Sequence, residues 1–149
     1  MLGYSAIPVP DNNCLSFDGT NDYVALANES LYDFTTEFTI EFWIKVDEWN
    51  RPWQSIITKG EGAWRIHRNN ETSKIAFETG QGTSLHTVLT ETDIEPGVWY
   101  HIMVQKLGGA GVLRIYVNGV MENSVSGVGT NCPTNNINVM IGENAEATG

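Results

Sequence analysis

Between residues 38 and 46 every second residue is apolar, without a break in the pattern. These apolar positions are Phe38, Ile40, Phe42, Ile44 and Val46. Because successive side chains of a β-strand point to opposite faces of its sheet, this period of two predicts a strand. The apolar face must be buried against a core, so a second layer is needed to cover it.

The same period recurs along the chain, and turn-forming residues separate the alternating segments. The segments span residues 55–59, 64–68, 74–78, 85–89, 99–106, 112–117 and 138–141. Asn118 and Gly119 stand between two strand-like halves, and such a pair supplies the positive φ angles of a tight hairpin turn. No window shows a sustained helical period, and residues 28–33 allow at most a short helical turn. Many short strands separated by turns predict an all-β antiparallel sandwich of the jelly-roll type.

Length and charge narrow the partners of such a fold. The 149 residues suffice for one domain with its own core and are too few for two. Eight basic against eighteen acidic residues give a formal net charge of −10, without a basic stripe. Phosphate backbones repel such a chain, so we expect no nucleic acid partner. The oxygen-rich surface is compatible with calcium, and a plain soluble acidic surface is the alternative.

No stretch approaches the ~20 apolar residues of a membrane span, so we expect no membrane insertion. Residues 1–11 show neither the basic nor the apolar region of a signal peptide. Either an export signal was removed or the protein is made and used without one. Cys14 and Cys132 lack metal-ligand spacing, and they form either a disulfide between the two ends of the chain or two buried free thiols.

Seven pieces of the sequence, taken in order, resemble the laminin-G-like jelly-roll domains of the concanavalin A-like lectin/glucanase superfamily. They span residues 15–24, 38–45, 57–60, 64–66, 96–101, 115–119 and 139–142. The resemblance implies a concanavalin A-like sandwich over residues 13–149, after an N-terminal extension of residues 1–12. It associates the domain with carbohydrate recognition and with appendages to larger extracellular proteins.

The sequence departs from this family at its end, because such domains usually finish with one more strand that carries an acidic residue. Here the chain stops at residues 145–149, and a sandwich without that strand has an edge of unpaired backbone groups. Three explanations stay open: the sequence is cut short, residues 4–9 fill the gap, or another chain supplies the strand. The last explanation favours assembly into something larger.

Glu91, Asp93 and Glu95 form the carboxylate cluster with the most enzyme-like spacing. On a strand they would share one face and resemble the Glu-x-Asp-x-Glu signature of glucanases, in which two carboxyl groups ~5 Å apart carry the reaction. Pro96 and Gly97 break a strand immediately afterwards, and the resemblance places the segment in a turn. A turn cannot hold two carboxylates at a fixed separation, so we expect no catalytic residue and no enzyme activity.

The loop between the alternating segments 38–46 and 55–59 is the candidate ligand site, through Trp49, Asn50, Arg51 and Trp53. Aromatic faces stack against the apolar faces of sugar rings, while Asn and Arg side chains bond sugar hydroxyl groups. The alternative is that one or both tryptophans fold back and cap the core.

The turn with Asp18, Gly19, Asn21 and Asp22 is the candidate metal site, with calcium as the ion. Two carboxylates, an amide oxygen and a carbonyl supply only part of the ~6 to 8 oxygen ligands that calcium needs. Related sandwiches often hold a structural calcium between the exit of the first strand and the closing strand, which makes Asp18 the best candidate. The alternative is an Asx turn in which Asp18 and Asn21 bond nearby backbone amides.

These observations predict a non-catalytic binding or adhesion domain whose partner is a glycan or a surface protein, with calcium as a candidate cofactor. A structural virion or surface-assembly protein, such as a phage decoration or fibre component bound to other chains, is the alternative, and a glycan-cleaving enzyme comes last. The expected location is extracellular, at a cell surface or in a virion. The step from sandwich to sugar binding is an analogy, because fold does not fix function.

Overall fold

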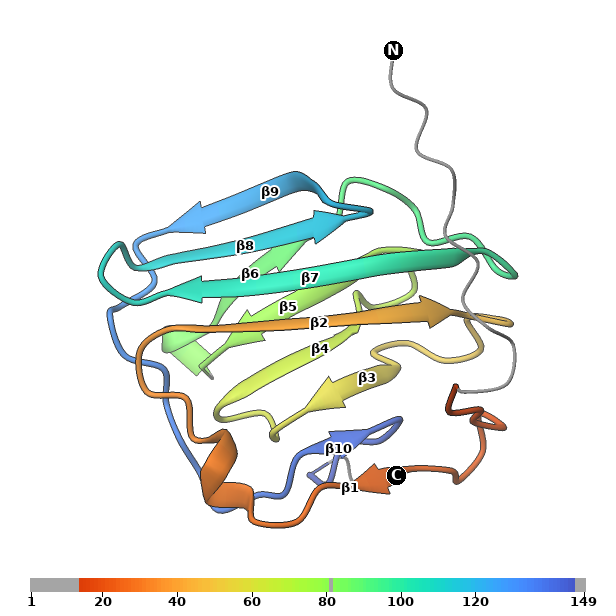
Figure 1. Ribbon diagram of the computed structural model, residues 1–149, viewed down its shortest axis with the longest axis horizontal. Helices are drawn as coiled ribbons and strands as arrows, with labels where there is room; N and C mark the ends of the chain where they lie inside the picture. Colours follow the sequence, from red (N-terminus) through yellow and green to blue (C-terminus); the bar gives the residue numbers. More distant parts are fainter. Residues whose placement is uncertain (1–13, 81, 147–149) are drawn as a thin grey trace.

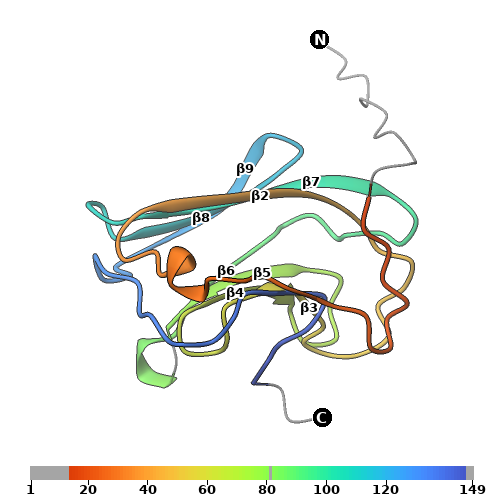
Figure 2. The ribbon, with the colours of Figure 1, turned by 60° about the horizontal axis from the view of Figure 1, so that its bottom comes forward.

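The computed structural model describes residues 14–80 and 82–146, and these residues form two antiparallel β-sheets that pack as a sandwich (Figures 1 and 2). The larger sheet has the order β1 (Val24–Ala25), β10 (Met140–Ile141), β3 (Ser55–Thr58), β4 (Trp64–Arg68), β5 (Ile75–Thr79), β6 (His86–Leu89). The smaller sheet has the order β2 (Phe38–Lys45), β7 (Trp99–Leu107), β8 (Val112–Val117), β9 (Val120–Ser126). The all-β jelly-roll fold predicted from the alternation is confirmed.

Strand β2 follows the predicted pattern. Phe38 and Val46 are buried at its two ends, and the apolar residues between them pack against the core cluster. Phe42 lies opposite Ile102 of β7, which is fully buried. The alternation thus lines β2 and β7 with side chains that face the larger sheet, which is why the two layers stay together.

The predicted hairpin at Asn118 and Gly119 is also confirmed. Both residues have positive φ angles, 51° and 80°, and Val117 pairs with Val120 across a two-residue turn. The short helical turn expected near residue 30 is the 3₁₀ helix η1 (Glu29–Tyr32), and a second one, η2 (Gly82–Ser84), precedes β6. No helix in the described part of the chain is long and apolar enough to cross a membrane.

A buried lysine ties η1 to the larger sheet. Lys59, directly after β3, has a fully buried side chain whose Nζ lies 2.8 Å from Glu29 Oε2 and 3.1 Å from Asp33 Oδ1. The same ammonium group donates to the carbonyl oxygens of Glu29 and Ile137, each at 3.1 Å. Since a buried charge is costly without partners, these four contacts fix η1 and the segment before β10 against the end of β3.

The two cysteines are not paired. Cys14 is exposed and Cys132 is buried, and both are free thiols, so the disulfide alternative is wrong and only one of the thiols is buried. Burial raises the pKa of the Cys132 thiol to about 11, which keeps it protonated at neutral pH.

Strand β2 stands at one edge of the smaller sheet, and its second edge pairs with no strand in the described residues. The predicted extension over residues 1–12, the segment 4–9 and the last residues 147–149 lie outside the part of the chain that the structure describes. The expected absence of a closing strand and its three explanations therefore stay predictions.

Candidate ligand-binding groove

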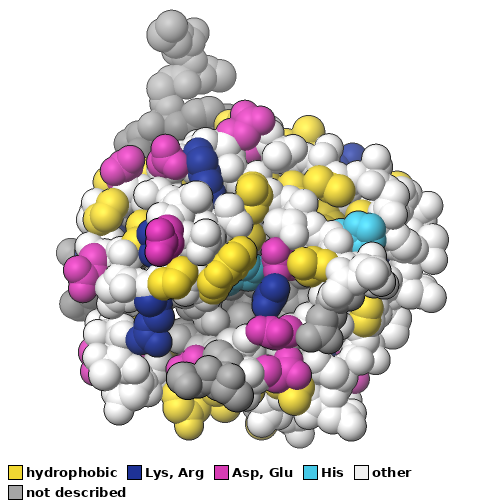
Figure 3. Space-filling model, turned by 180° about the vertical axis from the view of Figure 1, so that it is seen from behind, with side chains coloured by type: hydrophobic (Ala, Val, Ile, Leu, Met, Phe, Trp, Pro, Cys, Tyr) yellow, Lys and Arg dark blue, Asp and Glu magenta, His cyan; other side chains and the backbone are white. Residues whose placement is uncertain are grey.

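A groove of about 310 Å³ lies on the larger sheet, on the face turned away from the core. Its lining residues are Trp53, Ser55, Glu61, Arg65, His67 and Asn144. Seen from this side, apolar, basic, acidic and histidine side chains meet around a hollow in the surface (Figure 3). The volume falls at the lower end of the ~300–1,000 Å³ typical of small-molecule sites.

Strand alternation explains why charged side chains form the floor of the groove. In β4, Trp64 and Ile66 point into the core, so Arg65 and His67 between and after them point outward. Arg65 pairs in register with Glu78 of β5, and residues directly opposite across an antiparallel pair have neighbouring side chains. The pairing of β4 with β5 therefore sets a guanidinium group, an imidazole ring and a carboxylate side by side.

These three groups form a buried charged cluster. Arg65 Nε donates to Glu78 Oε2 at 2.6 Å, and His67 Nε2 lies 3.1 Å from the same oxygen. Glu78 Oε1 accepts a hydrogen bond of 2.8 Å from the hydroxyl group of Thr87 on β6. On its other side, His67 Nδ1 lies 2.7 Å from the carbonyl oxygen of Arg68, a distance at which the ring N–H donates. Every member of the cluster is thus held in one orientation.

The ionisation of Glu78 follows from these contacts. Burial by itself raises the pKa of this carboxyl group, but the hydrogen bond and charge of His67 outweigh it, with help from Thr87 and Arg65. The net effect lowers the pKa of Glu78 from 4.5 to about 2. At neutral pH the group is a carboxylate that accepts hydrogen bonds and has no proton to give.

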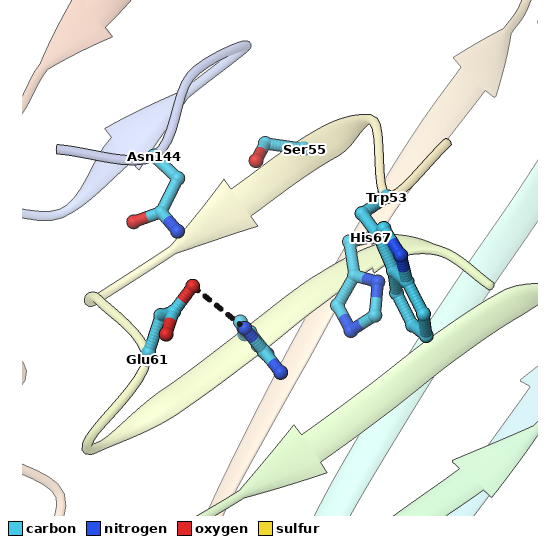
Figure 4. Close-up of a pocket in the computed structure, with 6 residues that line it drawn as sticks. Trp53, Ser55, Glu61, His67 and Asn144 are labelled. Atoms are coloured by element: carbon cyan, nitrogen blue, oxygen red, sulfur yellow. Dashed lines mark ion pairs between the residues drawn. The ribbon is translucent and has the colours of Figure 1, made fainter. Parts of the chain in front are cut away.

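The opposite side of the groove is formed by the turn after β3 and the segment after β10. Glu61 Oε1 lies 3.4 Å from Arg65 Nη1, the ion pair drawn in Figure 4. The backbone N–H of Glu61 also donates to the carboxylate of Glu146. Asn144 is buried, and its side-chain oxygen accepts the N–H of Glu146 at 3.2 Å. Segments far apart in the sequence therefore share one rim.

Trp53 is the aromatic wall of the groove. It is 52% exposed, and its ring centroid lies 5.6 Å from that of His67. Figure 4 shows the two labelled rings beside each other. The backbone of Trp53 has a φ of 54°, the left-handed region that bulky side chains rarely adopt. Strained residues of this kind cluster at ligand sites, and here the strained conformation directs the indole over the groove.

Arg68 holds the loop that carries Trp53. Its guanidinium group is buried and donates to three backbone carbonyl oxygens, those of Arg51, Glu71 and Thr72, each at 2.7 Å. It also lies over the ring of Trp49, 5.6 Å from the centroid. Because one side chain crosslinks the two loops on either side of the β3–β4 hairpin, the position of Trp53 is fixed before any ligand arrives.

The four predicted ligand residues fall into two groups. Trp49 is half-buried, packs against the core and donates its indole N–H to the carbonyl of Ile94 at 2.9 Å, so it caps the core. Asn50 and Arg51 are exposed and are not among the lining residues of the groove, whereas Trp53 lines it. The structure therefore places one of the four residues in this groove.

Sequence reasoning missed the rest of the lining, including a histidine, His67, to which it gave no role. A signal was present, since Arg65, His67 and Glu78 occupy the outward phase of two adjacent predicted strands. Charged residues on the outward face of a strand are ordinary at a surface, however, and only the strand register shows that these three converge.

The predicted metal turn adopts the Asx-turn arrangement. Asp18 Oδ1 accepts the backbone N–H groups of Thr20 at 2.8 Å and Asn21 at 3.3 Å, and Asp22 Oδ2 accepts the N–H of Asp18 at 3.0 Å. These hydrogen bonds, that of Thr20 above all, lower the pKa of Asp18.

The carbonyl of the neighbouring Gly19 is engaged as well, because it accepts a hydrogen bond of 2.7 Å from Arg51 Nη2. A guanidinium group beside this carbonyl is unfavourable for a second cation. Among the described residues, no group of three or more His, Cys, Asp and Glu side chains is arranged to hold a metal ion. The turn fits calcium poorly as it stands, and calcium binding stays a prediction.

The carboxylate cluster of residues 91–95 lies in the connection between β6 and β7, as expected, and not on a strand. Asp93 pairs with Lys74 at 3.0 Å, while Ile94 turns into the core. The side chains of Glu91 and Glu95 are exposed on this turn. The one-faced carboxylate pattern that a strand would give is absent from this segment.

A two-sheet sandwich with a polar groove and an aromatic wall on one outer face defines the class of this protein as a jelly-roll domain. Residues 18–149 match the concanavalin A-like lectin/glucanases superfamily, and the chain belongs to that family. The resemblance found in the sequence is thereby confirmed. A search of curated proteins found no match.

Solved structures with the same fold include several binding domains. The carbohydrate-binding module CBM40 of a Ruminococcus gnavus sialidase, bound to α2,3-sialyllactose, has a TM-score of 0.65 at 13% identity, and the match covers 80% of this chain and 71% of that one. The binding domain of Paraclostridial Mosquitocidal Protein 1 has a TM-score of 0.66 at 17% identity, covering 85% and 34%. The binding domain of Botulinum Neurotoxin DC, in complex with SialylT, has a TM-score of 0.60 at 21% identity, covering 82% and 32%. The chain spans about a third of each toxin domain, and at these identities the likeness shows the fold alone.

Proposed function

We propose that this domain is a non-catalytic glycan-binding module and that its ligand occupies the groove on the larger sheet. The observation that carries the proposal is the combination of an exposed aromatic wall, Trp53, with polar groups in the lining, above all the guanidinium group of Arg65, which Glu78 holds in place, and the hydroxyl group of Ser55. Sugar rings have apolar faces and a rim of hydroxyl groups, so this combination suits them.

Preorganisation supports binding further. The lining groups already have partners that fix their positions, and Arg68 fixes the loop of Trp53. A ligand that enters such a groove orders few side chains, which lowers the entropic cost of association.

Neighbours of the same fold support the ligand class. The CBM40 module is bound to a sialylated sugar, and the toxin domain was solved with SialylT. Proteins that recognise glycans act mostly at surfaces, so an extracellular or surface location forms part of the proposal.

The charge state of the groove supports a binding role over glycoside cleavage. Cleavage requires a carboxylic acid that is protonated near the working pH and donates to the leaving oxygen. Glu78, with a pKa of about 2, is ionised at neutral pH, and Glu61 faces the guanidinium group of Arg65. Glu78 therefore does not suit the role of the general acid.

The proposal is tested with a glycan array, followed by calorimetry on the best ligand with the Trp53→Ala variant. Removal of the aromatic wall should weaken binding about tenfold or more, since stacked aromatic anchors contribute ~1–3 kcal/mol. The matched control is Trp43→Ala, because Trp43 is 44% exposed on the outer face of the other sheet. An array without any bound glycan, or equal affinities for the two variants, would refute the proposal.

The free edge of β2 favours a second candidate, a structural component that assembles with other chains. An eight-residue strand with one unpaired edge in the described residues is a template for strand addition. Light scattering coupled to size-exclusion chromatography tests this candidate, which predicts a defined oligomer at micromolar concentration. A monomer at every concentration would contradict self-assembly.

A further inference from the structure

The charged side chains of the groove affect which sugars it can bind. The inference drawn from them rests on the proposed function. We infer that the groove selects neutral, hydroxyl-rich sugars and disfavours sugars that carry a carboxylate, such as sialic acid. The ligands of the sialylated complexes above would then not be transferable to this chain, although the fold is the same.

The guanidinium group of Arg65 already faces two carboxylates. Its Nε donates to Glu78 at 2.6 Å, and its Nη1 lies 3.4 Å from Glu61. A sialic acid carboxylate is recognised best by two parallel N–H groups of one free guanidinium fork. In Arg65 these donors are divided between two acidic partners from the protein, so its positive charge is already compensated.

The imidazole ring in the floor already faces protein groups at both of its nitrogens. His67 is buried, with Nε2 beside Glu78 and Nδ1 beside the carbonyl of Arg68. Its ring lies beside the ring of Trp53, tilted by 48° (Figure 4). An incoming anion therefore meets no uncompensated positive group in the lining.

Negative charge gathers on the rim that the turn after β3 and the segment after β10 form. The carboxylate of Glu146 accepts the backbone N–H of Glu61, so two acidic residues share the rim. The whole chain carries a formal net charge of −10, which repels an anionic ligand before contact. An anion in the groove would lie near at least three carboxylates and gain only one shared guanidinium group.

Neutral hydroxyl groups meet the opposite situation. A sugar hydroxyl group can both donate and accept a hydrogen bond. It would donate to the carboxylate of Glu61 and accept from Arg65 Nη2, a nitrogen without a partner in the described residues. Ser55 and Asn144 add uncharged polar groups to the lining. Hydrogen bonds to charged acceptors are stronger than those between neutral groups, so the compensated pair attracts hydroxyl groups while it repels carboxylates.

The experiment uses matched neutral and sialylated glycans on one array, with lactose and α2,3-sialyllactose measured also by calorimetry. For the wild-type protein we expect the neutral member of each bound pair to have the higher affinity. The Glu61→Gln variant removes one rim charge and frees Arg65 Nη1, so it should narrow the preference about three- to tenfold. Glu95→Gln, which makes the same charge change on an exposed turn, is the control and should leave the preference as it is.

The outcomes separate the two proposals. Binding of neutral glycans with a preference that narrows in Glu61→Gln supports both. Preferential binding of sialylated glycans, or a preference that Glu61→Gln and Glu95→Gln change equally, overturns the charge selection and leaves the glycan-binding proposal standing. An array with no bound glycan overturns the proposed function and this inference together.

Discussion

Acid should weaken this domain in a way that can be assigned to one residue, Glu78. The lowered pKa means that the folded protein favours the ionised form more than the unfolded chain does. The resulting stability is fully present above the unfolded pKa of about 4.5 and is lost as the pH falls toward the folded pKa of about 2. The difference between pKa values of 4.5 and about 2, at ~1.4 kcal/mol per pH unit, would give about 3.5 kcal/mol at neutral pH. Solvent screening at the partly exposed Arg65 lowers the contribution to about 3 kcal/mol.

The assay is urea denaturation of the wild-type protein and of Glu78→Gln at a series of pH values between 7 and 3. We expect Glu78→Gln to be less stable at pH 7 by up to about 3 kcal/mol and the difference to shrink below pH 4.5. Glu95→Gln, exposed on its turn, is the control and should follow the wild type throughout. A difference that stays constant down to pH 3, or a variant as stable as the wild type at pH 7, would refute the assignment.

Three further predictions concern the residues that hold the loops. Lys59→Met should destabilise the domain by about 3 kcal/mol in urea denaturation, because Glu29 and Asp33 lose their shared cation. Arg68→Lys should lower the melting temperature, since an ammonium group cannot reach the three carbonyls that the guanidinium fork spans, and should weaken glycan binding as the loop loosens. Millimolar calcium should raise the melting temperature of the wild type and not of Asp18→Ala; equal curves with calcium and with chelator would assign the turn a structural role alone.

The fold was predictable because apolar and polar residues alternate along its strands, and this alternation is a local property of the sequence. Residues 38–46 and 112–121 illustrate this, since alternation and an Asn-Gly turn suffice to define β2 and the β8–β9 hairpin. The shortest strands gave less signal. β10 has only two residues and β1 likewise, and both depend on pairing with each other and with β3 rather than on their own patterns.

Most of the groove could not be predicted, because the pairing register of the strands brings its residues together and no local sequence motif marks them. The loop of Trp53 was found from its composition, yet the same reasoning assigned Trp49 to the ligand, and only packing separates the two tryptophans. Arg65 and Glu78 are thirteen residues apart in the sequence. They meet because the pairing of β4 with β5 places them directly opposite each other, which another register would not do. Asn144 lines the same groove although it lies far from Arg65 and Glu78 in the sequence, so no local sequence pattern predicts its place there.

The two sites predicted from the sequence turn out to be physically connected, which bears on the calcium experiment. Arg51 donates to the carbonyl of Gly19 in the Asp18 turn, while its own carbonyl accepts from Arg68, the residue that fixes the Trp53 loop. A calcium ion that took the Gly19 carbonyl as a ligand would have to displace the Arg51 guanidinium group, because two cations cannot share one carbonyl without repulsion. Calcium binding should therefore release the Arg51 side chain and change glycan affinity, whereas a turn that binds no ion leaves the affinity independent of calcium.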